Sequence, residues 1–152
     1  MLKRVFLFLI IFIATLTFMS VAYSQMEKVE SPKTIILVSG EVVCNLNGEW
    51  DALIERYLLF TAPKEVVAGY KDIIKITQKG NEFVGIRLIG MEWLGKGTEA
   101  IRGTLDRNEF KEVQLLLKTS SGWEDFKGEL SKDCNKMVLD NGKGWKVTLE
   151  RK

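Results

Sequence analysis

The sequence predicts an all-β protein, an antiparallel up-and-down meander of eight strands that closes into a barrel. Three observations lead to this fold class. Apolar and polar residues alternate along short segments, asparagine-containing turns separate several of these segments, and glycines recur inside them. Alternation with a period of two is typical of strands that have one buried face. Successive hairpins of such strands make a meander.

The turns are marked by asparagines at equal intervals. Asn81, Asn108 and Asn135 stand 27 residues apart, and each is followed two residues later by an apolar residue. Asparagine tolerates left-handed backbone angles and bonds its own backbone, as tight hairpin loops require. We therefore expect each asparagine to lie in a hairpin turn. Equal spacing alone can arise by chance, so it does not indicate duplication.

The strands follow from the alternation around these turns. The alternating apolar residues are Ile74 and Ile76, then Val113, Leu115 and Leu117, and finally Trp145, Val147 and Leu149. The predicted strands lie near 48–60, 70–78, 82–89, 97–105, 109–118, 122–131, 136–140 and 144–151. Three glycines, Gly85, Gly103 and Gly128, fall inside them. Glycine weakens a strand unless the sheet bends or packs closely there, so this recurrence predicts a strongly coiled sheet that closes on itself.

Residues 1–24 have the three parts of a secretory signal peptide. A basic start precedes an apolar run, and Ala22 and Ser24 supply the small residues of a cleavage site. We predict cleavage before Gln25 and a secreted or periplasmic protein, with no stable membrane span left after cleavage. The alternative is an uncleaved anchor, because the apolar run is only slightly shorter than a spanning helix.

The remainder divides into two parts. Residues 25–47 are predicted to be a flexible leader and an N-terminal arm, in which the β-branched stretch 34–43 is either a short strand or an extended arm. Residues 48–152 are predicted to form a single barrel domain, a length that suits one domain with one core.

Charge and composition exclude several functions. The chain has 22 basic and 20 acidic residues, and the surplus, Lys3 and Arg4, lies in the predicted signal. A domain with no formal net charge does not attract phosphate groups over long distances, so nucleic acid is not an expected partner. The chain has no histidine, which excludes His-based triads and most zinc, copper and haem sites. We expect no metal and no cofactor.

Cys44 and Cys134 are the only cysteines of the chain. In an oxidising compartment, a single pair so far apart is expected to form a disulfide bond. The alternative is two free thiols or a redox pair. Neither cysteine has the C-x-x-C spacing that lowers a thiol pKa in redox motifs.

Gly48 and Trp50 stand at the start of the first barrel strand. This Gly-x-Trp resembles the opening motif of lipocalins and of their relatives in the calycin group. The resemblance implies a lipocalin-like barrel whose closed end is plugged by Trp50, with Arg151 packed against the tryptophan. If the sheet were instead a flattened sandwich or half-open, Trp50 would be an ordinary core residue.

The functional question is what fills the barrel. Eight strands are just wide enough to be filled by side chains or to hold one small ligand. We expect a small apolar molecule or lipid, with the entrance lined by Tyr57, Phe60, Tyr70, Trp93 and Trp123. The alternative is a filled barrel that serves as an envelope interaction or accessory module, using an edge, a loop or the 34–43 arm.

No group of residues indicates catalysis, so we do not expect an enzyme. The acidic residues are predicted to lie on the solvated outer face, and the adjacent Glu124 and Asp125 project to opposite faces of a strand, which gives no acid–base pair. The acidic residues in question are Asp51, Glu55, Asp72, Glu82, Glu99, Glu124, Asp125 and Glu129.

Overall fold

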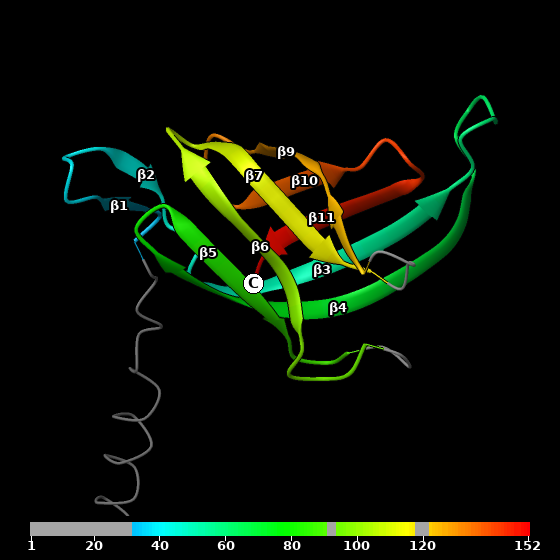
Figure 1. Ribbon diagram of the computed structural model, residues 1–152, viewed down its shortest axis with the longest axis horizontal. Coiled ribbons are helices and arrows are strands. Elements are labelled where there is room, and N and C mark those ends of the chain that lie inside the picture. The colour runs from blue at the N-terminus through cyan, green and yellow to red at the C-terminus, as the bar shows by residue number, and fades with distance from the viewer. Residues whose placement is uncertain (1–31, 91–93, 118–121) are drawn as a thin grey trace, which may run out of the picture. The chain divides into compact units, whose positions relative to one another are not determined.

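The structure is a computed structural model that describes residues 32–90, 94–117 and 122–152. The predicted signal peptide, the beginning of the predicted leader and Trp93 lie outside the described residues. Figure 1 gives the strand labels used below.

The described residues form a nine-stranded antiparallel sheet that curls into a nearly closed barrel (Figure 1). Its strands are β3 (Gly48–Tyr57), β4 (Val66–Lys79), β5 (Glu82–Arg87), β6 (Glu99–Asp106), β7 (Glu109–Leu116), β8 (Trp123–Asp125), β9 (Lys127–Leu130), β10 (Lys136–Asp140) and β11 (Trp145–Arg151). The order across the sheet is β8-β7-β6-β5-β4-β3-β11-β10-β9. Except for β3 and β11, all paired strands are consecutive in the chain, so the predicted all-β meander is confirmed.

The strand predicted at 122–131 is divided at Phe126, which is why the sheet has nine strands and not eight. β8 pairs with β7, whereas β9 pairs with β10. The N–H of Phe126 still donates to the carbonyl oxygen of Val113 (2.9 Å). The two edge strands of the sheet are therefore neighbours in the chain, and this brings its two edges together.

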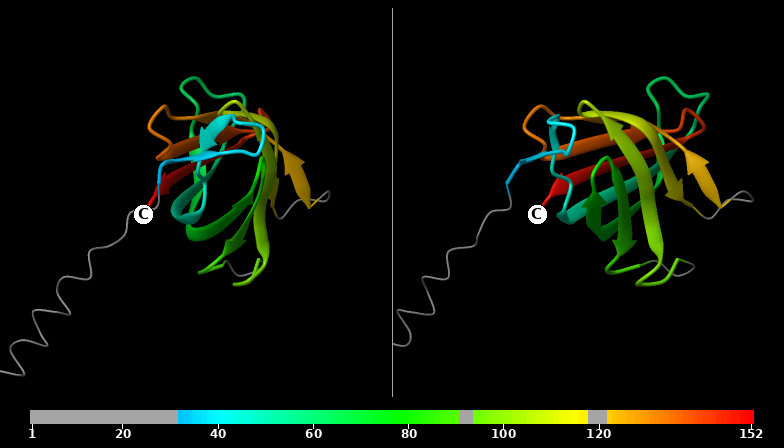
Figure 2. Two further views of the ribbon diagram at one scale, coloured as in Figure 1. Left: turned by 90° about the vertical axis from the view of Figure 1, so that its left-hand side faces the viewer. Right: turned by 60° about the vertical axis from the view of Figure 1, so that its left-hand side comes forward.

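The side chains alternate as predicted. In β4, Ile74 and Ile76 are buried, whereas Lys75 and Thr77 are exposed. The neighbouring strand β3 alternates in step with β4. Its buried Trp50 lies opposite Ile74, and its exposed Asp51 lies opposite Ile73. One face of every long strand therefore contributes to a shared apolar interior, and Figure 2 shows the strands wrapped around it.

The strand glycines allow close packing between strands. A Cβ added to Gly103 would lie 2.2 Å from the backbone oxygen of Glu112, and one on Gly128 would lie 2.5 Å from the Phe110 ring. Gly128 of β9 and Phe110 of β7 thus pack together where β7 and β9 lack a continuous ladder. These contacts show the close packing that the sequence predicts at the strand glycines.

The hairpin turns lie where the asparagines indicate. The asparagines themselves, however, do not all adopt the left-handed backbone angles that we expected of them. Only Asn108 adopts a left-handed angle (φ 69°), together with Arg107 (φ 50°). In the turn before Asn81 the left-handed residue is Gly80 (φ 63°), and in the turn before Asn135 it is Cys134 (φ 58°). Glycine adopts this angle without a steric penalty. In the first turn Gly80, and not its neighbour Asn81, therefore has the left-handed conformation.

A second, two-stranded sheet precedes the barrel. β1 (Thr34–Ile36) pairs antiparallel with β2 (Val42–Cys44), and we call residues 34–44 the N-terminal hairpin. The stretch predicted as one strand or an extended arm is therefore two short strands joined by a turn. Figures 1 and 2 place this hairpin at one end of the barrel, opposite the long β3–β4 loop.

Candidate functional site

Trp50 lies near the start of β3 and belongs to the apolar core. Its side chain is fully buried, and its Nε1–H donates to the carbonyl oxygen of Leu46 (2.9 Å). The guanidinium of Arg151 lies over the indole ring, 4.6 Å from its centroid. This is the contact that the lipocalin resemblance implies, and such stacking stabilises by about 0.5–2 kcal/mol.

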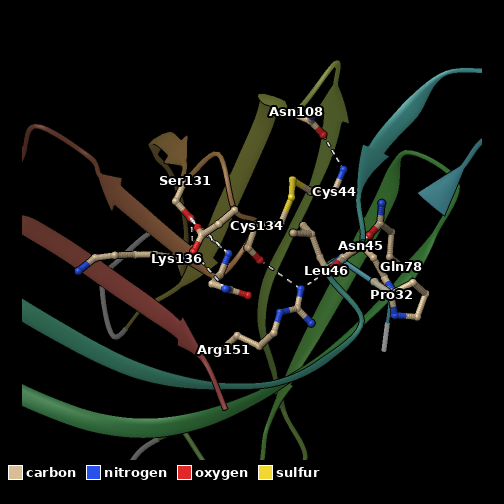
Figure 3. The surroundings of a disulfide bond; sticks show 12 residues. Pro32, Cys44, Asn45, Leu46, Gln78, Asn108, Ser131, Cys134, Lys136 and Arg151 are labelled. Atoms are coloured by element: carbon tan, nitrogen blue, oxygen red, sulfur yellow. Dashed lines mark hydrogen bonds between the residues drawn. A yellow bond between two sulfur atoms is a disulfide. The ribbon is translucent and has the colours of Figure 1, made fainter. Parts of the chain in front are cut away.

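Arg151 also fastens the chain that leads into β3 (Figure 3). Its Nη1 donates to the carbonyl oxygen of Asn47 (2.9 Å), and its Nη2 donates to those of Asn45 and Cys134, the latter at 3.3 Å. Burial lowers the pKa of Arg151 below its usual value. The residue therefore acts here as a multiple donor to backbone carbonyls, which suits a structural role.

Cys44 and Cys134 form the predicted disulfide bond (Figure 3). It joins β2 to the turn between β9 and β10, across a sequence separation of 90 residues. Next to it, the side-chain oxygen of Asn108 accepts a hydrogen bond from the N–H of Cys44 (2.5 Å). The base of the N-terminal hairpin is thus attached to two turns of the barrel.

A buried ion pair inside the barrel was not foreseen from the sequence. Nη1 of Arg87 on β5 lies 2.9 Å from Oδ2 of Asp72 on β4, and both side chains have 0% of their surface exposed. The prediction that Asp72 lies on the outer face is wrong. Its period-two relation to Ile74 and Ile76 places it on the inner face of β4, and that relation was the signal that could have revealed it.

This pair connects several elements of the barrel. Oδ1 of Asp72 accepts hydrogen bonds from the N–H groups of Ile73 (2.8 Å), Gly90 (3.2 Å) and Ile89 (3.3 Å). Nη2 of Arg87 donates to the carbonyl oxygen of Leu116 on β7 (2.9 Å). The Nε of Arg87 is buried without a hydrogen-bond partner. The pair therefore ties β4, β5 and β7 together from the inside.

Around this pair the interior is closely packed with apolar side chains. Thirteen apolar side chains of the strands expose 3% of their surface or less. They are Ala52, Ile54, Ile74, Ile76, Phe83, Ile101, Leu105, Val113, Leu115, Met137, Leu139, Val147 and Leu149. These side chains form one apolar core together with Trp50.

Tyr57 at the end of β3 and Tyr70 of β4 are the two predicted entrance residues that are at least partly shielded from solvent. Tyr57 is buried, its hydroxyl donates to Oδ1 of Asp140 (2.7 Å), and the Lys64 amine lies 4.4 Å from its ring centroid. Tyr70 is half-buried and packs against the core. Burial, together with the hydrogen bond and the negative charge of Asp140, raises the pKa of Tyr57 to about 12.

Asp140 accepts the hydrogen bond from Tyr57, and its pKa is shifted in the opposite direction, below its usual value. Burial alone raises its pKa, but the hydrogen bonds from Tyr57 and from the N–H of Gly142, with the charges of Lys64 and Lys146, outweigh burial and lower it. The Tyr57–Asp140 contact thus favours a protonated tyrosine and an ionised aspartate. It fixes the end of β3 to the β10–β11 turn.

The other predicted entrance residues do not join them. Phe60 is 99% exposed in the loop after β3. Trp123 lies opposite Leu116 in the β7–β8 ladder, on the outer face, with the Arg102 guanidinium 4.1 Å from its ring centroid. Trp93 lies outside the described residues. The described candidates are therefore spread over an inner wall, a loop and the outer face.

Glu124 corrects a second sequence prediction. It lies opposite the buried Leu115, its side chain is only 14% exposed, and Lys143 lies 3.3 Å away. Glu124 is therefore on the inner side of the sheet, and its placement on the outer face was wrong. Its neighbour Asp125 is exposed, so the pair does project to opposite faces as expected.

The most exposed apolar cluster of the described barrel lies at the tip of the β3–β4 hairpin. We call residues 58–67 the Phe60 tip; it comprises the connection after β3 and the first two residues of β4. Around Phe60, four aliphatic residues are each about half exposed. They are Leu58, Leu59, Val66 and Val67. Figure 1 shows this tip extending beyond the barrel end opposite the N-terminal hairpin.

The Phe60 tip has a defined conformation. The N–H of Leu58 donates to the carbonyl oxygen of Glu65 (3.0 Å). The hydroxyl of Thr61 donates to the carbonyl oxygen of Leu58 (3.3 Å) and accepts from the N–H of Glu65 (3.0 Å). These bonds close the loop upon itself, so Phe60 is presented to solvent by an ordered turn.

A separate groove of about 390 Å³ lies on the outer face of β11, β3 and β4. Its apolar part is formed by Leu53, Ile73 and Ile89, and Lys71 and Glu150 lie at its border. It contains none of the predicted entrance residues.

Within the described part of the chain, no group of acidic residues and cysteines is arranged to hold a metal ion. No helix in that part is long and apolar enough to cross a membrane. Comparison with known proteins gives no match to a family model, to a curated protein or to a solved structure.

Proposed function

We propose that this protein is an exported interaction module, a filled barrel that binds another protein through the Phe60 tip. One observation carries the proposal: an ordered turn presents a fully exposed phenylalanine among four half-exposed aliphatic side chains. Clustered apolar residues on a surface mark interaction sites, and aromatic anchors dominate the binding energy of such sites. Burying the phenylalanine alone would contribute about 1.5–3 kcal/mol.

The charges of the tip favour a protein over a membrane surface. The tip has one cation, Lys64, whose amine already lies over the Tyr57 ring, and Glu65 follows it directly. Attachment to anionic lipids relies on several basic residues, each contributing about 1 kcal/mol. A neutral apolar tip with an aromatic centre fits an apolar recess on a protein.

Export is part of the proposal. The signal-like residues 1–24 support it, and the Cys44–Cys134 disulfide is compatible with an oxidising compartment. The sequence-based alternative, a small apolar ligand inside the barrel, has less support because the named interior side chains are almost completely shielded by one another.

Site-specific photo-crosslinking in the producing cell tests this function. A photoreactive phenylalanine analogue replaces Phe60 in one variant and exposed Lys111 of β7 in the control. We expect one discrete protein adduct from the Phe60 site and none of the same identity from Lys111. The identified partner is then purified, and Phe60→Ser should weaken its binding at least tenfold, whereas Lys111→Ser should not.

Two results would contradict the proposal. One is an unchanged affinity of the purified partner for the Phe60→Ser variant. The other is adduct formation with lipid alone, accompanied by lipid that co-purifies with the protein in native mass spectrometry. The second result would restore the interpretation of the barrel as a lipid-binding protein.

A further inference from the structure

Among the residues that the structure describes, the hydrogen bonds of the N-terminal hairpin leave one of its strand edges open. The N–H of Leu37 donates to the carbonyl of Glu41, and the N–H of Asn45 donates to that of Lys33. In an antiparallel pair, hydrogen-bonded positions alternate with positions whose N–H and C=O groups point away from the partner strand. The residues between these bonds, Thr34 and Ile36, therefore direct their backbone groups away from β2.

The two outer edges of the hairpin differ. On the β2 edge, the N–H of Cys44 is already bonded to the Asn108 side chain of the barrel. On the β1 edge, Thr34 and Ile36 are exposed, and the Ile36 side chain is 77% exposed. An exposed edge of this kind is a template for pairing with another strand.

The open edge is held in place before any partner arrives. The disulfide fixes the end of β2. Asn45 fixes the start of β1, because its N–H bonds the carbonyl oxygen of Lys33 and its side-chain amide bonds that of Pro32 (2.7 Å). A strand held in its binding conformation loses little conformational entropy on pairing.

The side chains indicate what kind of strand would pair there. β1 contains no charged residue, and Ile36 lies directly opposite Val42 on an exposed apolar face that Val38 extends. Lys33 precedes β1 and is exposed. A strand antiparallel to β1 would bring its C-terminal side to Lys33, where an acidic residue complements the charge.

We infer that β1 is a second docking site, at which an extended segment of a partner protein adds antiparallel to Thr34–Ile36. The segment has apolar side chains at every second position and an acidic residue at its C-terminal side. Backbone hydrogen bonds supply affinity in this binding mode, and the alternate side chains supply selectivity. The inference does not depend on the Phe60 tip.

Nuclear magnetic resonance with a defined peptide tests this edge. The probe is an acetylated six-residue peptide of alternating threonine and valine that ends in glutamate, titrated into ¹⁵N-labelled protein. We expect saturable shifts of the Thr34 and Ile36 amide signals. Replacing the terminal glutamate by lysine should weaken binding at least threefold.

Two variants separate the backbone edge from the side chain. Ile36→Pro removes an N–H that faces away from the hairpin, so it spares the β1–β2 bonds and should weaken peptide binding at least tenfold. Ile36→Val keeps the N–H and should bind within twofold of the original protein. The intact disulfide mass and unchanged barrel signals confirm that each variant is folded.

Three outcomes would overturn the inference. They are the absence of saturable shifts at Thr34 and Ile36, equal binding by Ile36→Pro, and the same shifts appearing on concentration without peptide, which would identify a second copy of the chain as the occupant. Peptide shifts confined to the Phe60 tip would also overturn it, while leaving the proposed function of that tip intact.

Discussion

The barrel interior and the N-terminal hairpin use the same β-branched residues in opposite ways. Ile74 and Ile101 are completely buried, whereas Ile36 and Val38 are exposed to solvent. Conversely, the interior holds a buried ion pair, whereas β1 has no charge. This difference shows that a sequence with a high strand propensity does not by itself determine which of its side chains are buried. Burial requires a second layer, which the curled sheet supplies to its interior and the outward face of the hairpin with Ile36 and Val42 lacks, whereas Val43 of the same hairpin is completely buried.

The largest expected effect concerns the charged part of the interior. Arg87→Met leaves Asp72 buried without its counter-ion, and we expect the free energy of unfolding to fall by about 3–5 kcal/mol. Urea unfolding measures the change. As a control, Asp72→Asn combined with Arg87→Met should recover most of the loss, because both charges are then gone while the amide oxygen can still accept the backbone N–H bonds. A single Arg87→Met variant as stable as the original protein would contradict this account of the interior.

The next effect concerns the covalent attachment of the hairpin. Replacing Cys44 and Cys134 together by alanine should lower the free energy of unfolding by about 4 kcal/mol, because a long loop is released in the unfolded chain. Hydrogen exchange should accelerate most at the amides of β1 and β2. Equal protection of these amides with and without the disulfide would show that the barrel alone holds the hairpin.

Close packing between the adjacent strands β6 and β7 gives a smaller effect. Gly103→Ala places a methyl group 2.2 Å from a backbone oxygen, and we expect a loss of about 1–3 kcal/mol from overpacking. Gly95→Ala is the matched control, because nothing lies within 4 Å of its added Cβ; its change should stay within about 0.5 kcal/mol. Equal thermal unfolding midpoints for the two variants would refute the assignment of Gly103 to a tight contact.

The Tyr57–Asp140 contact at the end of the interior predicts a pH dependence. The pKa of Tyr57 is raised from 10.0 to about 12, so its stabilising effect is complete below pH 10 and is lost as the pH rises towards 12. Tyr57→Phe should cost about 1.5 kcal/mol at neutral pH and should flatten the pH profile of stability between pH 10 and 12. An unchanged slope in that window would rule out this contribution.

The smallest expected effect belongs to the hairpin surface. Ile36→Thr combined with Val42→Thr should change the free energy of unfolding by no more than about 0.5 kcal/mol, because both side chains are already exposed. Ile74→Thr, the matched interior change, should cost about 1–3 kcal/mol by burying an unpaired hydroxyl. If the hairpin variant were as unstable as the interior variant, the contrast between the two regions would be false.

Local sequence information was sufficient for the order of the strands and for most of the turns. The alternation around Ile74 and Ile76 predicted β4, and the glycine at position 103 predicted a close contact. The candidate entrance residues were less predictable. Tyr70 packs against the core and Tyr57 is buried against Asp140, whereas the register places Trp123 on the outer face. Phe60 lies in an irregular loop, where no periodicity indicates direction.

By itself, the sequence determined the meander, its turns and the pairing of its two cysteines, because period and turn chemistry are local and a single pair leaves one choice. Only the tertiary structure decided that Asp72 meets Arg87, that the strand at 122–131 breaks at Phe126, and that β1 keeps an open edge. These features depend on which strands become neighbours when the sheet curls and closes. That closure is set by packing between residues far apart in the chain, and no short stretch of sequence encodes it.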